Sequence, residues 1–129
     1  MKFMVLIYID GKRLDAIPTG EADAMMRHCL DYADALKRDG NLLDSQMLED
    51  APAARSIRIR DGRTVTTDGP FSETKEVLGG FNLIEAEDMD EAIEIASRFP
   101  WYRAGCVEIR PVRDIASVRR RVSETPAAG

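Results

Sequence analysis

The sequence predicts an α+β fold in which two β-α-β halves are joined by a β-hairpin. Short strand-like runs alternate with two amphipathic segments, residues 20–38 and 89–99. Between the halves, an Asp-Gly pair at residues 61–62 separates two alternating runs, as in a two-residue hairpin. The resulting order is strand, helix, strand, hairpin, strand, helix, strand. This order favours an antiparallel-rich sheet with two helices on one face.

The size and composition of the chain favour one soluble domain. With 129 residues and 44% hydrophobic composition it can bury a core without disulfides or metal. A formal net charge of −5 provides no positive field for phosphates, so no nucleic-acid partner is expected. No phosphate loop or metal-binding cluster stands out, so neither cofactor nor metal is expected.

The location expected from the sequence is the cytoplasm. Cys29 and Cys106 lie far apart without C-x-x-C spacing, which fits a reducing compartment and excludes a thioredoxin-like motif. The chain enters a strand-like run at once, without a secretion signal. No segment approaches the roughly 20 apolar residues of a membrane span, so no membrane association is expected.

The first half begins with a strand and a long helix. Residues 3–9 are a continuous apolar run, which predicts the central strand of the sheet. Residues 10–20 are expected to form a loop, with Thr19 capping the helix at residues 20–38. The apolar face of this helix is expected to pack on the sheet. It contains Ala22, Met25, Met26, Cys29, Ala33 and Leu36.

The middle of the chain predicts a second strand and the hairpin. Gly40 suits the left-handed conformation that ends a helix. Residues 41–48 are expected to form a strand, and residues 49–54 a turn. In the hairpin, Ile57 and Ile59 alternate with polar residues, which predicts one wet face. Its four arginines could bind an acidic ligand, although a solvated face is the preferred interpretation. They are Arg55, Arg58, Arg60 and Arg63.

The stretch TDGPFSETKEVLGGF, residues 67–81, carries the strongest local signal. Asp68 is expected to cap a stiff corner, in which Gly69 takes an unusual backbone angle and Pro70 fixes its own. Phe71 is expected to be buried against the domain or a partner. A polar loop and a Gly-Gly pair follow. The candidate ligand-binding residues are Tyr8, Asp68, Gly69, Pro70, Phe71, Thr74, Lys75 and Glu76.

The second half repeats strand, helix and strand. Residues 81–86 are a predicted strand, and Asp88 is a predicted helix cap with Glu91 at the capping-box position. The helix stripe consists of Met89, Ala92, Ile93, Ala96 and Phe99, and Pro100 ends it. Residues 106–112 close the sheet as an edge strand. The aromatic cluster at 101–103 is expected to serve packing, with a pocket or a subunit contact as alternatives.

A tail follows the domain, which we expect to span residues 1–113. Within residues 114–129, Ile115, Val118 and Val122 predict a short helix, and the end of the chain is expected to fray. The arginines at 119–121 indicate an acidic contact. The preferred partner is the domain's own carboxylates.

Several motifs together resemble one family. The run TDGPFSETKE followed by GGF closely resembles the signature of the DGPF group of YCII-related proteins. The opening MKFMVLIY, the Asp-Gly hairpin, LIEAEDMDEAIEIA and VEIRPV also resemble that family, in the same order. The resemblance implies a ferredoxin-like fold that pairs into dimers. It also implies possible association with extracytoplasmic-type sigma factors, because relatives are found with them.

The element order by itself also leads to a ferredoxin-like βαβ-hairpin-βαβ sandwich. Such a domain covers one sheet face with helices and leaves the other bare. Packing two bare faces together would bury them in a symmetric homodimer with an α/β barrel-like form. A pocket is then expected between helix and sheet or at the dimer seam.

His28 is the only histidine in the chain and lies at the edge of the first helix's apolar face. With Asp31 nearby it could be an acid-base group, or it could be an ordinary half-exposed helix residue. Some YCII-related proteins carry a histidine paired with an aspartate near this helix. When the helix ends are aligned, that position falls on Cys29 instead of His28.

Three classes of function remain open. The preferred one is a dimeric module that binds a small molecule or has a regulatory role. The second is a cofactor-free isomerase or lyase, with His28 and Asp68 as acid-base groups and Lys75 holding an anion. The third is a structural adaptor, in which the 67–81 loop builds only a subunit interface.

Overall fold

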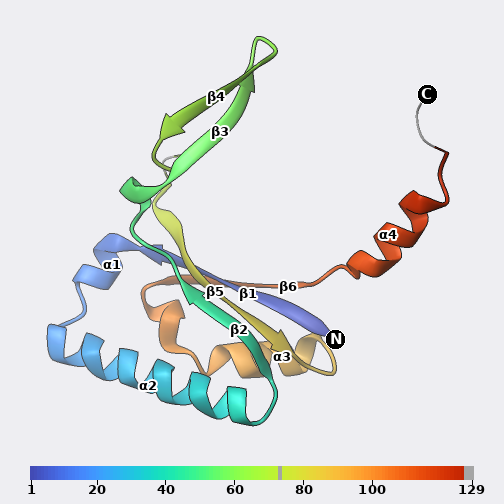
Figure 1. Cartoon of the computed structure of the whole chain (residues 1–129). Coiled ribbons are helices and arrows are strands. Elements are labelled where there is room, and N and C mark those ends of the chain that lie inside the picture. Colours follow the sequence, from blue (N-terminus) through green and yellow to red (C-terminus); the bar gives the residue numbers. More distant parts are fainter. Residues whose placement is uncertain (73, 127–129) are drawn as a thin grey trace.

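The computed structural model describes residues 1–72 and 74–126 (Figure 1). A four-stranded antiparallel sheet has the order β2-β5-β1-β6, and helices α2 and α3 cover one face. The elements are β1 (Lys2–Asp10), α2 (Thr19–Arg38), β2 (Leu42–Met47), β5 (Glu76–Glu85), α3 (Met89–Ser97) and β6 (Gly105–Pro111). The predicted α+β, ferredoxin-like architecture is confirmed, with β1 in the middle and β6 at an edge. The chain end predicted to fray falls partly in residues 127–129, outside the described residues.

Alternate residues of β1 face opposite sides of the sheet, as strand geometry requires. Phe3 and Val5 point to the helices and are each only 1% exposed. Met4, Leu6 and Tyr8 point the other way and are half-buried. They pair across β1 and β5 with further apolar side chains. We call the surface made by Met4, Leu6, Tyr8, Phe81 and Leu83 the helix-free face.

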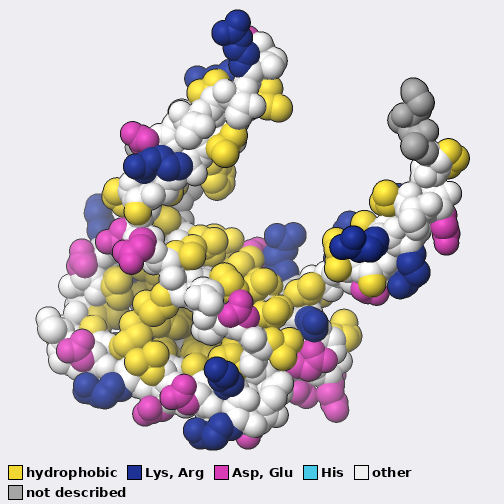
Figure 2. All heavy atoms as spheres, viewed as in Figure 1, with side chains coloured by type: hydrophobic (Ala, Val, Ile, Leu, Met, Phe, Trp, Pro, Cys, Tyr) yellow, Lys and Arg dark blue, Asp and Glu magenta, His cyan; other side chains and the backbone are white. Residues whose placement is uncertain are grey.

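The helix-free face lies between two projecting arms. Figure 2 shows hydrophobic side chains gathered on the sheet between these arms. One arm is the hairpin of β3 (Arg55–Arg60) and β4 (Arg63–Asp68), and the other is α4 (Ile115–Ser123). Both extend from the side of the sheet opposite α2 and α3.

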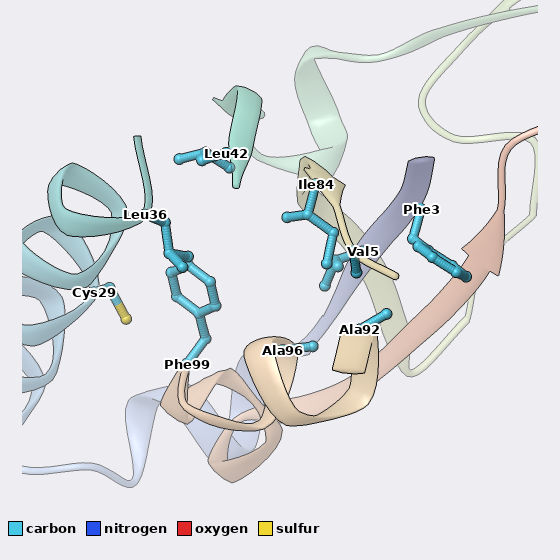
Figure 3. Packing of buried hydrophobic residues seen from close by; sticks show 10 residues of the cluster. Phe3, Val5, Cys29, Leu36, Leu42, Ile84, Ala92, Ala96 and Phe99 are labelled. Atoms are coloured by element: carbon cyan, nitrogen blue, oxygen red, sulfur yellow. The ribbon is translucent and has the colours of Figure 1, made fainter. Parts of the chain in front are cut away.

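The core fills the layer between the sheet and the two helices (Figure 3). Ala92 and Ala96 of α3 are small and fully buried, which brings this helix close to the sheet. The Phe99 ring packs edge-on against Tyr32 with centroids 4.6 Å apart, and the Tyr32 hydroxyl donates to the Ile95 carbonyl at 2.8 Å. These contacts join α2 to α3. Each large apolar side chain buried here stabilises the fold by about 1.5 to 3 kcal/mol.

The helix ends agree with the sequence in part. The Asp88 carboxylate accepts the Glu91 N–H at 2.9 Å, which confirms the predicted cap. The predicted Thr19 cap is wrong, because α2 already includes Thr19 and begins after Pro18. The loop expected after β1 contains helix α1 (Gly11–Asp15), because Asp10 accepts the Lys12 N–H at 3.0 Å and caps it.

The hairpin arm forms as predicted, but its surroundings differ. Asp61 and Gly62 have φ of 51° and 76°, as a type I′ turn requires. Strands β3 and β4 pair only with each other within the described residues. Ile57 and Ile59 are 71% and 77% exposed. The expectation of only one wet face is therefore wrong for the single chain, because no second layer covers these isoleucines.

The second arm, α4, also forms where the sequence predicts a helix. Asp114 caps it by accepting the Ala116 N–H at 3.0 Å and the Ser117 hydroxyl at 2.8 Å. The Ser117 hydrogen bond, followed by that from Ala116, lowers the pKa of Asp114. Among the described residues, no carboxylate forms an ion pair with Arg119, Arg120 or Arg121. The expectation that the tail lies back on its own domain is wrong, because α4 extends away from the body.

Two close backbone approaches shape the sheet near its hairpin end. Strand β5 begins at Glu76, five residues before the predicted start, because Gly79 and Gly80 remain within it and the register shifts opposite Ile7. A Cβ on Gly80 would lie 2.8 Å from the Gln46 carbonyl oxygen. A Cβ on Gly105 would collide with the Tyr8 carbonyl oxygen. Both glycines let neighbouring strands approach without a side chain between them.

We predict that Gly105→Ala destabilises the protein by about 3 kcal/mol, because the added methyl group must displace the backbone of β1. The matched control is Gly20→Ala, whose Cβ meets nothing within 4 Å at the start of α2. Because alanine favours helices, the control should gain about 0.5 to 1 kcal/mol. Urea unfolding of both variants provides the measurement. Equal stability of the two variants would contradict the proposed backbone collision.

Candidate functional site

A cavity of about 590 Å³ lies where the hairpin arm joins the sheet. We call it the arm-base pocket. Three segments form its walls: the link from β2 to β3, the loop after β4, and paired residues at the hairpin end of β1 and β5. The lining residues are Tyr8, Leu48, Glu49, Asp50, Ala51, Ala53, Ala54, Ser56, Pro70, Phe71, Ser72, Thr74, Glu76, Val77 and Leu78. Of the predicted ligand-binding residues, Tyr8, Pro70, Phe71, Thr74 and Glu76 line this cavity, and their role in binding stays a prediction. The wall at residues 48–54 was not predicted.

The corner at the pocket's edge is held by backbone and by Ser56. Gly69 has φ of 88°, a conformation that glycine adopts readily. Its N–H donates to the Ala54 carbonyl at 2.8 Å, and its own carbonyl accepts the Ser56 hydroxyl at 2.8 Å. The Asp68 carboxylate is 90% exposed and pairs with the Arg55 Nε at 3.1 Å. Asp68 therefore does not cap the corner as predicted, and neither Asp68 nor Gly69 lines the pocket.

The loop after the corner brings an aromatic ring to the pocket. The Phe71 side chain lines it but is 75% exposed, so the predicted burial is wrong within one chain. Its carbonyl accepts a hydrogen bond from Arg58 at 2.6 Å, which fixes the loop to the hairpin. Thr74 donates to the Glu76 carbonyl at 2.6 Å, at the point where β5 begins. The backbone of this loop is thus fixed, while the Phe71 side chain is largely exposed.

Lys75 is directed to a carboxylate that the sequence reading did not single out. Asp10 is 3% exposed, and its Oδ2 lies 3.7 Å from the Lys75 Nζ. Its other oxygen accepts the Lys12 N–H. One feature of the sequence could have identified Asp10: it is a carboxylate placed directly after the apolar run at residues 3–9. The positive charge of Lys75 is therefore paired with the carboxylate of Asp10. Lys75 does not line the pocket.

Tyr8 supplies a hydroxyl at the sheet side of the pocket. This hydroxyl donates to Glu108 Oε1 at 3.4 Å. Desolvation, followed by the negative charge of Glu108, raises the pKa of Tyr8, while Arg110 opposes the shift. The phenol therefore remains protonated at neutral pH and can donate a hydrogen bond.

The pocket has a negative character. Three carboxylates, on Glu49, Asp50 and Glu76, line it, and its described lining contains no lysine or arginine. Figure 2 shows acidic side chains gathered where the hairpin arm joins the sheet. A cavity lined by one sign of charge attracts ligands of the opposite sign.

His28 lies in the helix layer, apart from the arm-base pocket. Its Nε2 is 3.1 Å from the Arg98 carbonyl oxygen, and its ring stacks on Tyr32 with centroids 6.3 Å apart. The hairpin arm that contains Asp68 extends from the other side of the sheet (Figure 1). The structure therefore does not bring His28 and Asp68 together. The neighbouring Cys29 is buried, and burial raises the pKa of its thiol to about 11.

The described residues contain neither a cluster suited to a metal ion nor a helix suited to crossing a membrane. No group of three or more histidine, cysteine or acidic side chains is arranged to hold a metal ion. None of the described helices combines the length and apolar character needed to cross a membrane.

Comparison with known proteins places the chain in a family. The YCII-related domain matches residues 1–116. The chain belongs to the YCII-related family. This YCII-related chain is 33% identical over 114 residues to an uncharacterized protein of Rhizobium meliloti (strain 1021), covering 87% of the chain and 92% of the relative. Its membership in the DGPF group and a domain boundary at residue 113 stay predictions.

A solved structure shares the fold of this YCII-related chain. It is 5-chloro-2-hydroxyhydroquinone dehydrochlorinase from Burkholderia phenoliruptrix AC1100, in complex with 2,5-dihydroxybenzoquinone. The TM-score is 0.50 with 17% sequence identity, covering 88% of this chain and 94% of the enzyme. At this identity the likeness concerns the fold.

We predict that Tyr8 ionises above pH 10, because desolvation and Glu108 both raise its pKa from the ordinary tyrosine value of 10.0. Since the folded pKa exceeds the unfolded one, this contribution to stability is present below pH 10 and is lost as pH rises through the folded value. Tyrosinate absorbance of the protein minus that of Tyr8→Phe measures the transition. In Glu108→Gln the same transition should move to lower pH, and an unchanged midpoint would contradict the assigned role of Glu108.

Proposed function

We propose that this YCII-related chain is a dimeric module that binds a small molecule in the arm-base pocket. The observation that supports the proposal most is the pocket itself. Its volume of about 590 Å³ lies within the range of small-molecule sites. Apolar side chains from Leu48 to Leu78 offer contact area, and the Tyr8 and Thr74 hydroxyls offer a few polar groups for orientation.

The charges of the pocket select the ligand class. Glu49, Asp50 and Glu76 oppose an anion, and Lys75 faces Asp10 instead of the cavity. A neutral or cationic ring compound fits better, because it can lie against the exposed Phe71 ring and donate a hydrogen bond to the Tyr8 hydroxyl oxygen, whose own proton is donated to Glu108. The proposed ligand is therefore a small aromatic molecule without negative charge.

The proposed dimer forms through the helix-free face. Its apolar side chains on β1 and β5 are only half-buried in one chain. Such a sheet surface is commonly covered by a second sheet, about 10 Å away. A second copy in a symmetric pair would cover it on both molecules at once and give a barrel-like assembly.

We predict a homodimer at micromolar concentration and a monomer of 14.4 kDa for Leu6→Glu, because the substitution places a charge on the helix-free face. Sedimentation equilibrium measures the mass, and circular dichroism confirms that the variant stays folded. A suitable control is Leu30→Glu on α2, where the leucine is already 55% exposed. A monomeric unaltered protein would refute the proposed assembly.

A second candidate function is cofactor-free acid-base catalysis. The observation that favours it is that the dehydrochlorinase with the same fold is an enzyme bound to a quinone. In this chain, Tyr8 could supply a proton and Glu76 could accept one, since both line the pocket. The earlier assignment of His28 and Asp68 to this chemistry stays a prediction. The structural adaptor remains the third candidate if no ligand binds.

Ligand titrations followed by amide NMR shifts test the proposed function. We expect benzylamine and hydroquinone to shift signals of the arm-base pocket and benzoate to bind at least about tenfold more weakly, because like charge opposes it. Ala53→Trp should abolish these shifts by filling the cavity. Ala24→Trp, on the exposed surface of α2, makes the same substitution elsewhere.

Two outcomes would count against the proposal in different ways. Shifts that persist in Ala53→Trp would place the ligand outside the arm-base pocket. Preferential binding of benzoate would refute the assignment of ligand charge.

A further inference from the structure

Helix α4 has an apolar stripe that the described residues of its own chain leave largely uncovered. Ile115 and Val122 are 66% and 54% exposed, with Val118 between them on the same helix face. The helix has only nine residues, and helices this short are marginal in isolation. A helix of this kind is normally stabilised by packing its stripe on another surface.

The charge of the tail differs in sign from that of the domain. Residues 113–124 contain four arginines and two carboxylates, a net charge of +2. The formal net charge of the chain is −5, so the remaining residues carry −7. The tail is therefore attracted to the acidic surface of this protein, whether in its own chain or in another copy.

The arm-base pocket complements α4 in both respects. Leu48, Phe71 and Leu78 are 45%, 75% and 37% exposed beside the carboxylates of the pocket. The nearest arginines of the hairpin are already engaged, since Arg55 pairs with Asp68 and Arg58 donates to the Phe71 carbonyl. An apolar stripe flanked by arginines fits a surface of exposed apolar side chains flanked by carboxylates.

We propose that α4 of one copy docks on the arm-base pocket of a second copy and completes its wall. The stripe of α4 packs on Phe71 and Leu78, and Arg119 and Arg120 pair with Glu49 and Asp50. The pocket of each subunit thus contains residues from its partner. This inference rests on the homodimer of the proposed function and adds the exchange of α4 to it.

The topology explains why the partner's pocket is the one occupied. Pro111, the last residue of β6, pairs with Phe3, whereas the pocket lies at Tyr8, about 17 Å further along β1. The Val112 N–H donates to the Lys2 carbonyl at 2.9 Å, which anchors the start of the tail at the far end of the sheet. From there α4 extends away from its own body (Figure 1).

Electrostatics also selects between two ways of pairing the helix-free faces. If the two β1 strands run parallel, α4 meets α4 and six arginines gather, three from residues 119–121 of each copy. If they run antiparallel, the α4 end of each copy lies over the hairpin end of the other. Opposite charges then meet twice, so the antiparallel arrangement is favoured.

Charge exchange in the full chain tests the proposal through the dimer dissociation constant, measured by sedimentation equilibrium. Arg119→Glu with Arg120→Glu should weaken the dimer at least about tenfold, and so should Glu49→Lys with Asp50→Lys. Combining all four changes should restore the constant to within about threefold, because each pair is re-formed with its signs exchanged. Arg27→Glu with Arg38→Glu makes the same change in charge on α2 and should leave it unchanged.

A second measurement follows the apolar contact. Val118→Asn with Val122→Asn should shift the amide NMR signals of Phe71 and Leu78, although these residues are distant from α4 in their own chain. Absence of these shifts, or absence of restoration in the fourfold variant, would overturn the proposal. So would retention on heparin that depends on Arg119 and Arg120 while the dimer constant does not, because α4 would then serve a different acidic partner. In the proposed dimer Arg119 and Arg120 offset the charges of Glu49 and Asp50, so the benzylamine titration is repeated with the monomeric Leu6→Glu variant, in which no partner α4 is docked. Ligand binding and α4 exchange can then fail separately.

Discussion

Antiparallel pairing of β1 with both β5 and β6 is the constraint on which the rest of the structure depends. Gly105 permits the closest part of this pairing, where β6 passes the Tyr8 carbonyl without a side chain between them. The same pairing sets one end of β1 beside the start of β5 and the other beside the end of β6. The hairpin arm and α4 consequently leave the sheet at opposite ends of β1, with the helix-free face between them.

Local signals predicted most of the elements. The continuous apolar run at residues 3–9 was sufficient to predict β1, and helical periodicity was sufficient to predict α2, which has one face that must be buried. The Asp88 cap and the turn at Asp61 and Gly62 were predictable, since each depends on residues within about three positions. These features depend on local contacts within the folded chain.

The remaining features depend on contacts across the chain. Asp68 was assigned to a cap, but Arg55 on the paired strand binds it, and Ser56 holds the corner instead. No local pattern in residues 48–54 predicts a pocket wall, because the wall forms only where this link meets the loop after β4 and the paired ends of β1 and β5. Phe71 and Ile57 look like core residues by type. Their exposure follows from the absence of a second layer within one chain.

The self-contained pairing of the hairpin arm has a further consequence for how such a chain can change. Because β3 and β4 bond only to each other among the described strands, residues can be added next to Asp61 and Gly62 without altering the register of the central sheet. Insertion of one residue in each strand would reverse the side of the hairpin on which the side chains beyond the inserted residues lie. Insertion of two residues in each strand would leave those side chains on their original side. The arm can therefore lengthen in increments of about 7 Å. Natural variation or engineering can thus change the length of the hairpin arm without changing the four-stranded sheet and its helices.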